Sequence, residues 1–339
     1  MTRPFLFAAG VVLLVALFGA GYLCAFLWTP YQGHPSVTEI EIRKGDSFAA
    51  ITRELSGKGV ISQWRPLVLW AQLRGVDKRV HPGLYRFEGT VSPASVLARL
   101  VDGGSVHYRV TIPEGLTVRQ IADLLERRGR VSAAEFVAAA KDPALLESLG
   151  GDSVEGYLFP ATYKLPAVTT EEQIVGTMLA TFERRFTAEL EARGRAIGMT
   201  RHQVVTLASI IEKEGGPHDE WSTVSAVFHN RLKRGMRLQS DPTVIYGLAN
   251  FNGNLTRRDL RTPGPYNTYR ISGLPPGPIA NPGLAAINAA LFPAAVDYLY
   301  FVSKNDGSHH FSATLREHNK AVDRYQRNGR ARSRKVASP

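Results

Sequence analysis

The N-terminal end of the chain contains a long stretch without a single charged residue. From Pro4 to Trp28 the sequence is dominated by Leu, Val, Phe, Ala and Gly. A helix rises about 1.5 Å per residue, so about 20 apolar residues can cross the hydrocarbon core of a bilayer. We therefore expect residues 5–28 to form a single transmembrane helix.

The residues that flank this stretch indicate its orientation. Arg3 precedes it, and no Lys or Arg follows until Arg43. Trp28 and Tyr31 lie at its far end, where amphipathic aromatic side chains favour the membrane interface. Positive flanks remain in the cytoplasm, so we expect residues 1–4 to lie inside and the chain after the helix to lie outside.

Two alternatives to an anchor remain, and both fit less well. A cleaved signal peptide has a shorter apolar region and a cleavage site of small residues. A lipoprotein needs a small residue before its cysteine, but Leu23 precedes Cys24.

The length and the charge limit what the rest of the chain can do. A chain of 339 residues suggests about two domains. Lys and Arg number 41 against 30 Asp and Glu, and the net charge of +11 suggests an anionic partner. An extracytoplasmic domain does not ordinarily meet nucleic acid, so anionic lipid and cell-wall polymer remain as partners. One cysteine excludes an intramolecular disulfide and a Cys-rich metal site.

The first part of the exposed chain has the pattern of a small α+β module. Residues 29–37 contain two prolines and a glycine and are typical of a linker. Alternating or capped apolar patterns then predict a strand at 38–43, a helix that begins after Asp46 or Ser47, a helix at about 66–73 and a strand at 83–87. We expect this module to span 38–110, followed by a mixed α+β domain over 111–326.

The second domain begins with one more strand and contains several helices. We expect strands at 108–112 and 298–303 and helices after Thr117 and Ser132 and at about 170–194, 200–214, 218–234 and 312–326, with loops and short strands from 235 to 293. Residues 327–339 are rich in arginine and are typical of a disordered basic tail.

Several well-known site motifs are missing from the sequence. It contains no phosphate-binding loop, no dinucleotide-binding glycine motif, no nucleophile elbow and no HExxH motif. His309, His310 and His318 lie close in sequence but without a pattern of carboxylates. We therefore expect neither a metal site nor a cofactor.

The segment 200–214 has the strongest local signal for a catalytic group. Thr200 and Gln203 form a capping box. Apolar residues then recur at intervals of three and four residues, which is the spacing of one buried helix face. At about 100° per residue, Glu214 lies about 20° from Leu207 on that face, whereas Glu212 points outward.

The end of this predicted helix affects the acidity of Glu214. The run from Gly215 to Pro217 ends the helix, so Glu214 lies at the negative end of the helix dipole. That position and partial burial both raise the pKa of a carboxyl group. Glu214 therefore has the properties of a general acid, although a structural glutamate at a helix end remains an alternative.

A polar and aromatic region follows this helix. Aromatic faces combined with amide and hydroxyl groups suit carbohydrate, whose rings have apolar faces and hydroxyl rims. The candidate substrate-binding residues are Gln239, Asp241, Tyr246, Tyr266, Asn267 and Tyr269.

Several runs in this region resemble one known family. They are 208–214 (ASIIEKE), 228–232 (FHNRL), 235–247 (GMRLQSDPTVIYG), 266–269 (YNTY), 273–283 (GLPPGPIANPG) and 318–320 (HNK). The sequence resembles the MltG/YceG-like family of bacterial endolytic murein transglycosylases from the anchor to about residue 325. The strand–helix–helix–strand module resembles a LysM-like unit, which in such proteins is associated with glycan binding.

The resemblance implies an activity and a catalytic residue. The family's catalytic glutamate is the second Glu of the Glu-Lys-Glu motif, which here is Glu214. The implied reaction is non-hydrolytic cleavage of MurNAc–GlcNAc bonds within nascent peptidoglycan strands, which leaves 1,6-anhydro-MurNAc ends. The implied location is the bacterial inner membrane with a periplasmic catalytic domain, beside peptidoglycan synthases as possible partners.

Two positions depart from the family pattern, and one other function fits the sequence. Gly215 stands where members commonly have Thr, and Ala161 where they commonly have Asp. The alternative is a membrane-anchored, non-catalytic cell-wall-binding scaffold for synthases, in which Glu214 matters no more than Glu212.

Overall fold

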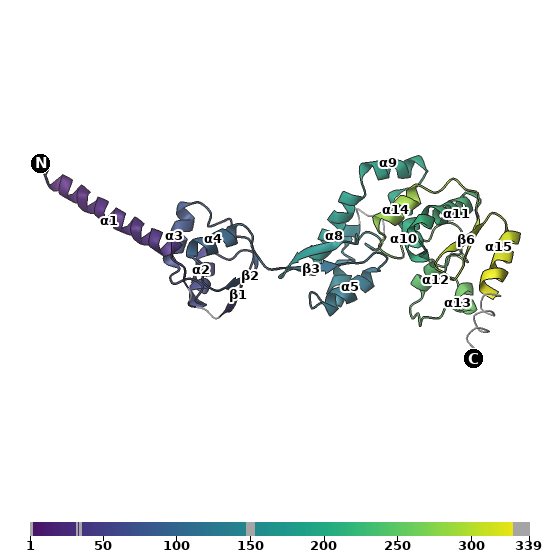
Figure 1. Cartoon of the computed structure of the whole chain (residues 1–339), viewed down its shortest axis with the longest axis horizontal. Coiled ribbons are helices and arrows are strands. Elements are labelled where there is room, and N and C mark those ends of the chain that lie inside the picture. The colour runs from purple at the N-terminus through teal and green to yellow at the C-terminus, as the bar shows by residue number, and fades with distance from the viewer. Residues whose placement is uncertain (1–2, 32, 34–35, 147–152, 328–339) are drawn as a thin grey trace. The chain divides into compact units, whose positions relative to one another are not determined.

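A computed structural model describes residues 3–31, 33, 36–146 and 153–327 (Figure 1). The chain divides into two compact units. The N-terminal unit comprises Met1–Arg109 and Lys164–Thr169, and the C-terminal unit comprises Val110–Tyr163 and Thr170–Pro339. Both units contain helices and strands, so the predicted mixed α+β class is confirmed.

The N-terminal unit begins with the apolar helix. α1 extends over Arg3–Trp28, and its part Phe7–Trp28 is long and apolar enough to cross a membrane by length and composition. The other elements of this unit are β1 (Val37–Ile42), α2 (Phe48–Gly57), α3 (Arg65–Leu73), β2 (Gly83–Glu88) and α4 (Pro93–Val101).

The predicted order of strand, helix, helix and strand is confirmed in this unit. β1 pairs with β2 antiparallel, with Ile40 opposite Tyr85. Alternate residues of β1 are buried, as its period of two predicts. Ser47, rather than Asp46, caps α2, because its side chain accepts a hydrogen bond from the Ala50 amide.

A second two-stranded sheet lies where the chain passes between the units. It is formed by β3 (His107–Thr111) and β4 (Thr162–Pro166). Each of these strands contains a point at which the chain leaves one unit and enters the other.

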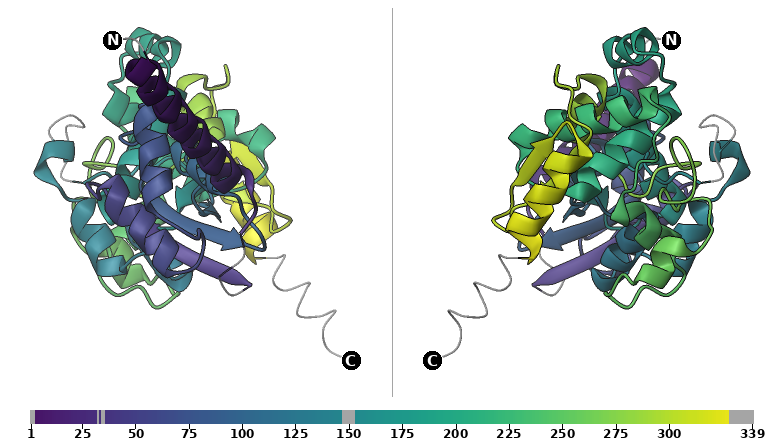
Figure 2. Two further views of the ribbon diagram at one scale, coloured as in Figure 1. Left: turned by 90° about the vertical axis from the view of Figure 1, so that its left-hand side faces the viewer. Right: turned by 90° about the vertical axis from the view of Figure 1, so that its right-hand side faces the viewer.

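The C-terminal unit is mostly helical and carries one small hairpin. Its helices before the polar and aromatic region are α5 (Val118–Arg127), α6 (Ala133–Ala139), α7 (Pro143–Leu146), α8 (Glu171–Arg185), α9 (Ala188–Ala196), α10 (Arg201–Glu214), η1 (His218–Glu220) and α11 (Trp221–Lys233). They are followed by α12 (Asp241–Gly247), α13 (Arg257–Arg261), α14 (Leu284–Leu291), β5 (Tyr300–Ser303), β6 (His309–Ser312), α15 (Leu315–Val322) and η2 (Asp323–Arg327). The β5–β6 hairpin and α15 lie side by side (yellow in Figure 2).

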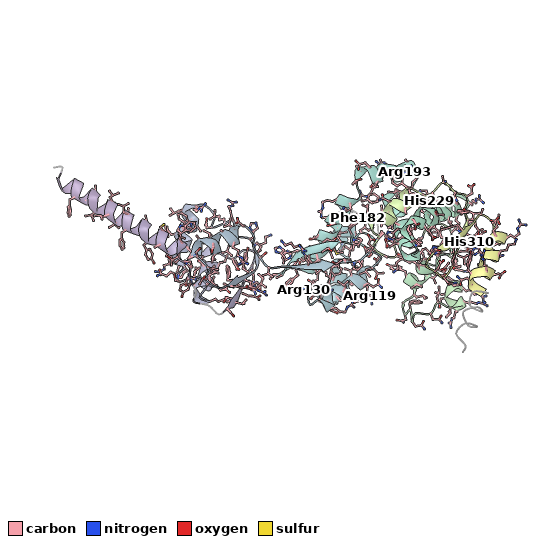
Figure 3. All side chains as sticks on the ribbon, viewed as in Figure 1. Arg119, Arg130, Phe182, Arg193, His229 and His310 are labelled. Carbon is pink, nitrogen blue, oxygen red and sulfur yellow. The ribbon has the colours of Figure 1, made fainter. Side chains whose placement is uncertain are left out.

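The core of the C-terminal unit is built around α10. Every residue from Val204 to Ile211 is buried, because α9, α11, α12 and α14 all pack against this helix. The prediction of one buried face was therefore too narrow. His229, which Figure 3 labels, lies on α11, and its Nε2 is 2.8 Å from the Ala290 carbonyl of α14.

The predicted helix at 170–194 was wrong in its continuity. It is two helices, α8 and α9, separated at Phe186 and Thr187. Phe186 leaves the helical conformation and is buried against Phe182, with their ring centroids 5.5 Å apart. Thr187 is extended and begins α9, and Phe186 joins the core cluster of this unit.

Two further predictions from the C-terminal half need correction. Residues 235–293, all of which the structure describes, contain α12, α13 and α14 and no strands. The last helix begins at Leu315 rather than Ser312, because Ser312 belongs to β6 and Thr314 caps α15. Of the predicted basic tail at 327–339, Arg327 belongs to η2, and residues 328–339 lie outside the described residues.

Candidate functional site

Glu214 lies at the C-terminal end of α10, where it is half-buried. The predicted capping box of Thr200 and Gln203 begins the helix, and Gly215 ends it. The hydroxyl of Ser240 donates a hydrogen bond to Oε1 of Glu214 at 2.5 Å. A carboxyl group on the central helix is thus joined to the segment that precedes α12.

The environment of Glu214 favours its protonated form. Burial, as the main cause, and the negative charge of Asp241 raise the pKa of this carboxyl to about 7. The hydrogen bond from Ser240 and the charge of Arg231 act in the opposite direction. A carboxylic acid with a pKa near neutrality can both give up and take back a proton under physiological conditions.

The two glycines after Glu214 have conformations that other residues rarely adopt. Gly215 has φ 74° and ψ −148°, a combination found essentially only for glycine. Gly216 has φ 81°, and an added Cβ there would lie 2.6 Å from Cε1 of His309. A threonine at position 215 would be strained in this backbone, so the departure from the family pattern agrees with the local conformation.

The Ser240 segment is held by buried hydroxyl groups. The Ser240 amide donates to Oγ1 of Thr268 at 2.9 Å, and the Thr243 hydroxyl donates to the Ser240 carbonyl at 2.7 Å. Ser240 and Thr268 are both buried. These bonds fix the position from which Ser240 reaches Glu214.

Arg231 supports the same segment from α11. Its guanidinium is buried and donates to the carbonyls of Leu238 and Leu299, each at 2.7 Å. Burial lowers the pKa of this arginine, although an arginine remains charged in proteins. Sequence reasoning assigned no role to Ser240 or Arg231; a Ser-Asp-Pro signal at a helix start could have identified Ser240.

Three of the predicted binding residues lie next to Ser240. Gln239 is exposed and has φ 53°, which is uncommon for a residue other than glycine. Asp241 is exposed, and its Oδ1 accepts a hydrogen bond from the Tyr269 hydroxyl at 2.6 Å. Burial and the adjoining Asp241 raise the pKa of Tyr269, so its hydroxyl keeps its proton.

Tyr246 and Tyr266 form a second group. Their rings meet edge to face with centroids 4.8 Å apart, and the Tyr246 hydroxyl donates to Oε2 of Glu155 at 3.4 Å. Glu155 is buried and also accepts hydrogen bonds from the Val118 amide and the Asn281 side chain. Burial raises the pKa of Glu155 to about 7.

Asn267 has its side chain inside the fold. It is buried, and its Nδ2 donates to the carbonyls of Asp259, Leu260 and Thr262. Its Oδ1 accepts a hydrogen bond from the Tyr269 amide at 3.0 Å. Asn267 therefore orders the loop that presents Tyr266 and Tyr269.

The expected outward orientation of Glu212 was wrong. Glu212 is half-buried, and its Oε2 accepts a hydrogen bond from the Gly283 amide at 3.1 Å. Burial raises the pKa of Glu212 as well. The cause is the packing around α10, which covers more of the helix than its apolar pattern indicates. Lys213 is exposed as predicted, and it donates to the Gly115 carbonyl.

The histidines near the C-terminal end have partners within the fold. Nδ1 of His309 lies 2.8 Å from Oε2 of Glu220, and the His318 ring stacks on Tyr300. Across the residues that the structure describes, no three His, Cys, Asp or Glu side chains are grouped so that they could hold a metal ion.

Comparisons with known proteins agree with the family resemblance. A model of the YceG-like family matches residues 40–324. An endolytic murein transglycosylase of Bacillus subtilis is 31% identical over 309 residues, which cover 86% of this chain and 85% of that protein. One from Streptococcus pneumoniae is 28% identical over 339 residues, and the alignment covers 90% of this chain but only 61% of the relative.

A solved structure is also similar. It is a crystal structure of a yceG-like protein from Listeria monocytogenes, with a TM-score of 0.58 and 32% sequence identity. The match covers 84% of this chain and 98% of the Listeria chain.

Proposed function

The chain belongs to the YceG-like family, and from this premise we propose that it is an endolytic murein transglycosylase, a lyase that cleaves peptidoglycan glycan strands internally. Relatives from Bacillus subtilis and Streptococcus pneumoniae bear this name. An enzyme name on both relatives favours catalysis over a non-catalytic scaffold.

The observation that supports this proposal is the state of Glu214. Its pKa is raised to about 7 by burial, and it stands at the end of a rigid core helix. Glycosidic cleavage needs a carboxylic acid that can donate a proton near neutral pH. We assign this role to Glu214.

The proposed reaction uses one carboxyl group twice. Glu214 donates its proton to the oxygen between MurNAc and GlcNAc, and the bond from that oxygen to the MurNAc anomeric carbon breaks. Positive charge develops at this carbon and is stabilised by the neighbouring N-acetyl group. The Glu214 carboxylate then takes the proton of the MurNAc C6 hydroxyl, whose oxygen closes the 1,6-anhydro ring.

This sequence of steps explains why a second catalytic carboxylate is unnecessary. Ordinary glycosidases use two carboxyl groups, one for the leaving group and one for water or for the sugar. Here the substrate's own hydroxyl is the nucleophile, and no cofactor takes part.

In this proposal, the candidate aromatic and polar residues form the binding surface for sugar rings. We propose that Gln239, Asp241 and Tyr269 contact the sugar nearest to Glu214. Tyr246 and Tyr266 contact a neighbouring sugar, while Asn267 holds the loop in place. Apolar ring faces of a sugar pack on aromatic side chains, and hydroxyl rims accept and donate hydrogen bonds.

The proposal extends to the arrangement in the cell. Residues 5–28 anchor the chain in the bacterial inner membrane with the N-terminus inside. Residues 38–110 form a LysM-like module that binds glycan, and residues 111–326 form the periplasmic catalytic domain. An enzyme held there meets nascent strands as synthases release them, so peptidoglycan synthases are the proposed protein partners.

The activity is tested with the full chain and purified peptidoglycan, and the products are analysed by mass spectrometry. The unchanged chain is expected to cut strands internally and to leave an anhydro-MurNAc end on the fragments. Glu214→Gln lowers their rate of formation by at least about 100-fold, which is the lower range of general acid catalysis.

Glu212→Gln is the matched control, because it lies on the same helix and an amide oxygen can still accept the Gly283 hydrogen bond. It is expected to retain activity. Products with reducing ends would mean hydrolysis, and full activity of Glu214→Gln would remove this residue from the mechanism.

A further inference from the structure

The last turns of α1 are part of the hydrophobic core of the N-terminal unit. Leu27 is 2% exposed, and Leu23 and Phe26 pack against the same core. The Tyr22 hydroxyl also donates to Oε1 of Gln63 at 3.0 Å. The module is therefore packed against the end of α1, in addition to being joined to it by the chain.

This packing changes how much of α1 can lie in lipid. Before Leu23 the helix is exposed, as Val12 at 69% and Phe18 at 81% show. The hydrocarbon core needs about 20 residues of helix, and a count from Phe5 reaches Cys24. The final turn, which ends at Trp28, then lies at the level of the lipid headgroups.

α3 presents an apolar stripe beside this part of α1. Leu67 and Ala71 face the core, whereas Leu69 and Leu73 are 52% and 68% exposed. Arg65 lies on the same face of α3 as Leu69 and Leu73, because residues four apart share a helix face. The stripe and α1 enclose an apolar groove of about 690 Å³, lined by Gly19, Ala20, Tyr22, Leu23, Arg65, Pro66, Leu69 and Leu73.

Arg65 lines this groove, and Arg53 and Arg74 contact the rings of Trp64 and Trp70 on the same unit. Arg53 and Arg65 lie over the Trp64 ring at 4.9 and 5.2 Å, and Arg74 lies over Trp70 at 5.6 Å. All three arginines are exposed. Tryptophan favours the membrane interface, and a guanidinium group matches phosphate oxygens with paired donors.

We propose that α3 docks on the bilayer that α1 crosses. Leu69 and Leu73 lie among the acyl chains, one acyl chain occupies the groove, and Arg53, Arg65 and Arg74 contact lipid phosphates. The groove is continuous with the lipid-facing surface of α1 and is level with Gly19–Leu23, below the headgroups. A phospholipid therefore fits both the apolar lining of the groove and Arg65 within that lining.

Docking has a consequence for the module. α3 is held at the membrane surface, so the module that contains α3 cannot swing freely relative to α1. Glycan reaches this unit from the side opposite the lipid. The inference depends on the proposed anchor but not on the proposed catalytic activity.

The test places a fluorescent label in the full chain within vesicles of phosphatidylglycerol and phosphatidylethanolamine. Cys24→Ser removes the single native thiol, and Leu73→Cys introduces the site for an environment-sensitive dye. Matched chains carry the dye at Val12→Cys, on the exposed part of α1, and at Glu41→Cys, on exposed β1. A lipid with a nitroxide on its acyl chain is the quencher.

Quenching and a blue shift of the emission are expected at positions 12 and 73 but not at 41. Quenching at position 12 but not at position 73 would overturn the docking of α3 and would still support the anchor. No quenching at 12 would overturn the anchor and the docking together. Glycan cleavage is not measured, so failure of the catalytic proposal cannot be mistaken for either result.

A second comparison tests the headgroup contacts. Arg65→Gln with Arg74→Gln is expected to weaken quenching at position 73. Arg43→Gln with Lys44→Gln removes the same charge from the exposed turn after β1 and is expected to leave quenching unchanged. An equal loss in both pairs would contradict specific phosphate contacts at α3.

Discussion

The Ser240 hydroxyl donates a hydrogen bond of 2.5 Å to Oε1 of Glu214. It stabilises the ionised carboxylate, whereas burial favours the neutral acid. The balance between these effects sets the fraction of Glu214 that carries a proton at neutral pH. Because a general acid acts only when protonated, we expect activity to fall as the pH rises through about 7.

Ser240→Ala is expected to move this alkaline limb to higher pH. Loss of the donor raises the pKa of Glu214 by about one to two units, because a hydrogen bond to a charged group contributes about 1.5–3 kcal/mol. The pH profile of kcat/KM for glycan cleavage measures the shift. The control is Ser312→Ala, which removes another buried hydroxyl that makes no hydrogen bond to Glu214. An unmoved limb in Ser240→Ala would contradict the role of this bond.

Asp241→Asn is expected to shift the limb in the opposite direction. The charge of Asp241 raises the pKa of Glu214, so its removal lowers that pKa and the limb moves to lower pH. An amide oxygen can still accept the Tyr269 hydrogen bond. Asp123→Asn makes the same charge change on the exposed side of α5, and its profile is expected to match the unchanged chain. If both variants shift alike, net charge rather than Asp241 is responsible.

The sequence allowed Glu214 to be identified, but not its partner. A capping box, an apolar period and a glycine stop are local signals, and together they place Glu214 at the end of a core helix. Ser240 reaches it only because Arg231 and Thr268 hold the segment before α12. Contacts between distant segments leave no such periodic trace in a single sequence.

The difference between local signals and contacts of distant segments also explains which elements were predicted correctly. The β1–α2–α3–β2 order follows from alternation and caps, which act within a few residues. Phe186 is buried in the core cluster that residues of α10, α11 and α14 also form, and Glu212 is half-buried where it accepts the hydrogen bond of the Gly283 amide. Local patterns therefore predict elements well, whereas burial on the second side of a helix depends on the tertiary fold.

Glu155 is expected to make stability depend on pH. Its pKa is raised to about 7 in the folded chain, above its ordinary value, so its contribution is fully present below about pH 4.5 and is lost as the pH rises through about 7. Glu155→Gln removes this titration. Relative to the variant, the unchanged chain loses about 3 kcal/mol of unfolding free energy across this range.

Urea titrations read by hydrogen exchange of α10 peptides measure the unfolding free energy of the C-terminal unit. Both chains carry Glu214→Gln, so that the titration of Glu214 does not contribute. Glu135→Gln, at an exposed position of α6, is expected to leave the pH dependence unchanged. A Glu155→Gln chain whose stability falls with pH as steeply as that of the chain with Glu155 would show that another group is responsible.

Substitutions in the two glycines after Glu214 are expected to differ in severity. Gly215→Ala strains the backbone, since φ 74° with ψ −148° is essentially restricted to glycine. This strain costs about 1–3 kcal/mol. No atom lies within 4 Å of its added Cβ. Gly216→Ala adds a collision, because its Cβ would lie 2.6 Å from the His309 ring, which Glu220 holds in place.

Both changes disturb the helix end that positions Glu214, so we expect glycan cleavage to fall in each and to fall further in Gly216→Ala. His309→Ala opens space beside Gly216, and it is expected to restore part of the loss in Gly216→Ala but none in Gly215→Ala. Rates of anhydro-MurNAc formation and thermal unfolding measure the coupling in the two glycine variants, His309→Ala and the two double variants, each compared with the unchanged chain. If His309→Ala had the same effect in both glycine variants, contact with His309 would not be what makes residue 216 sensitive.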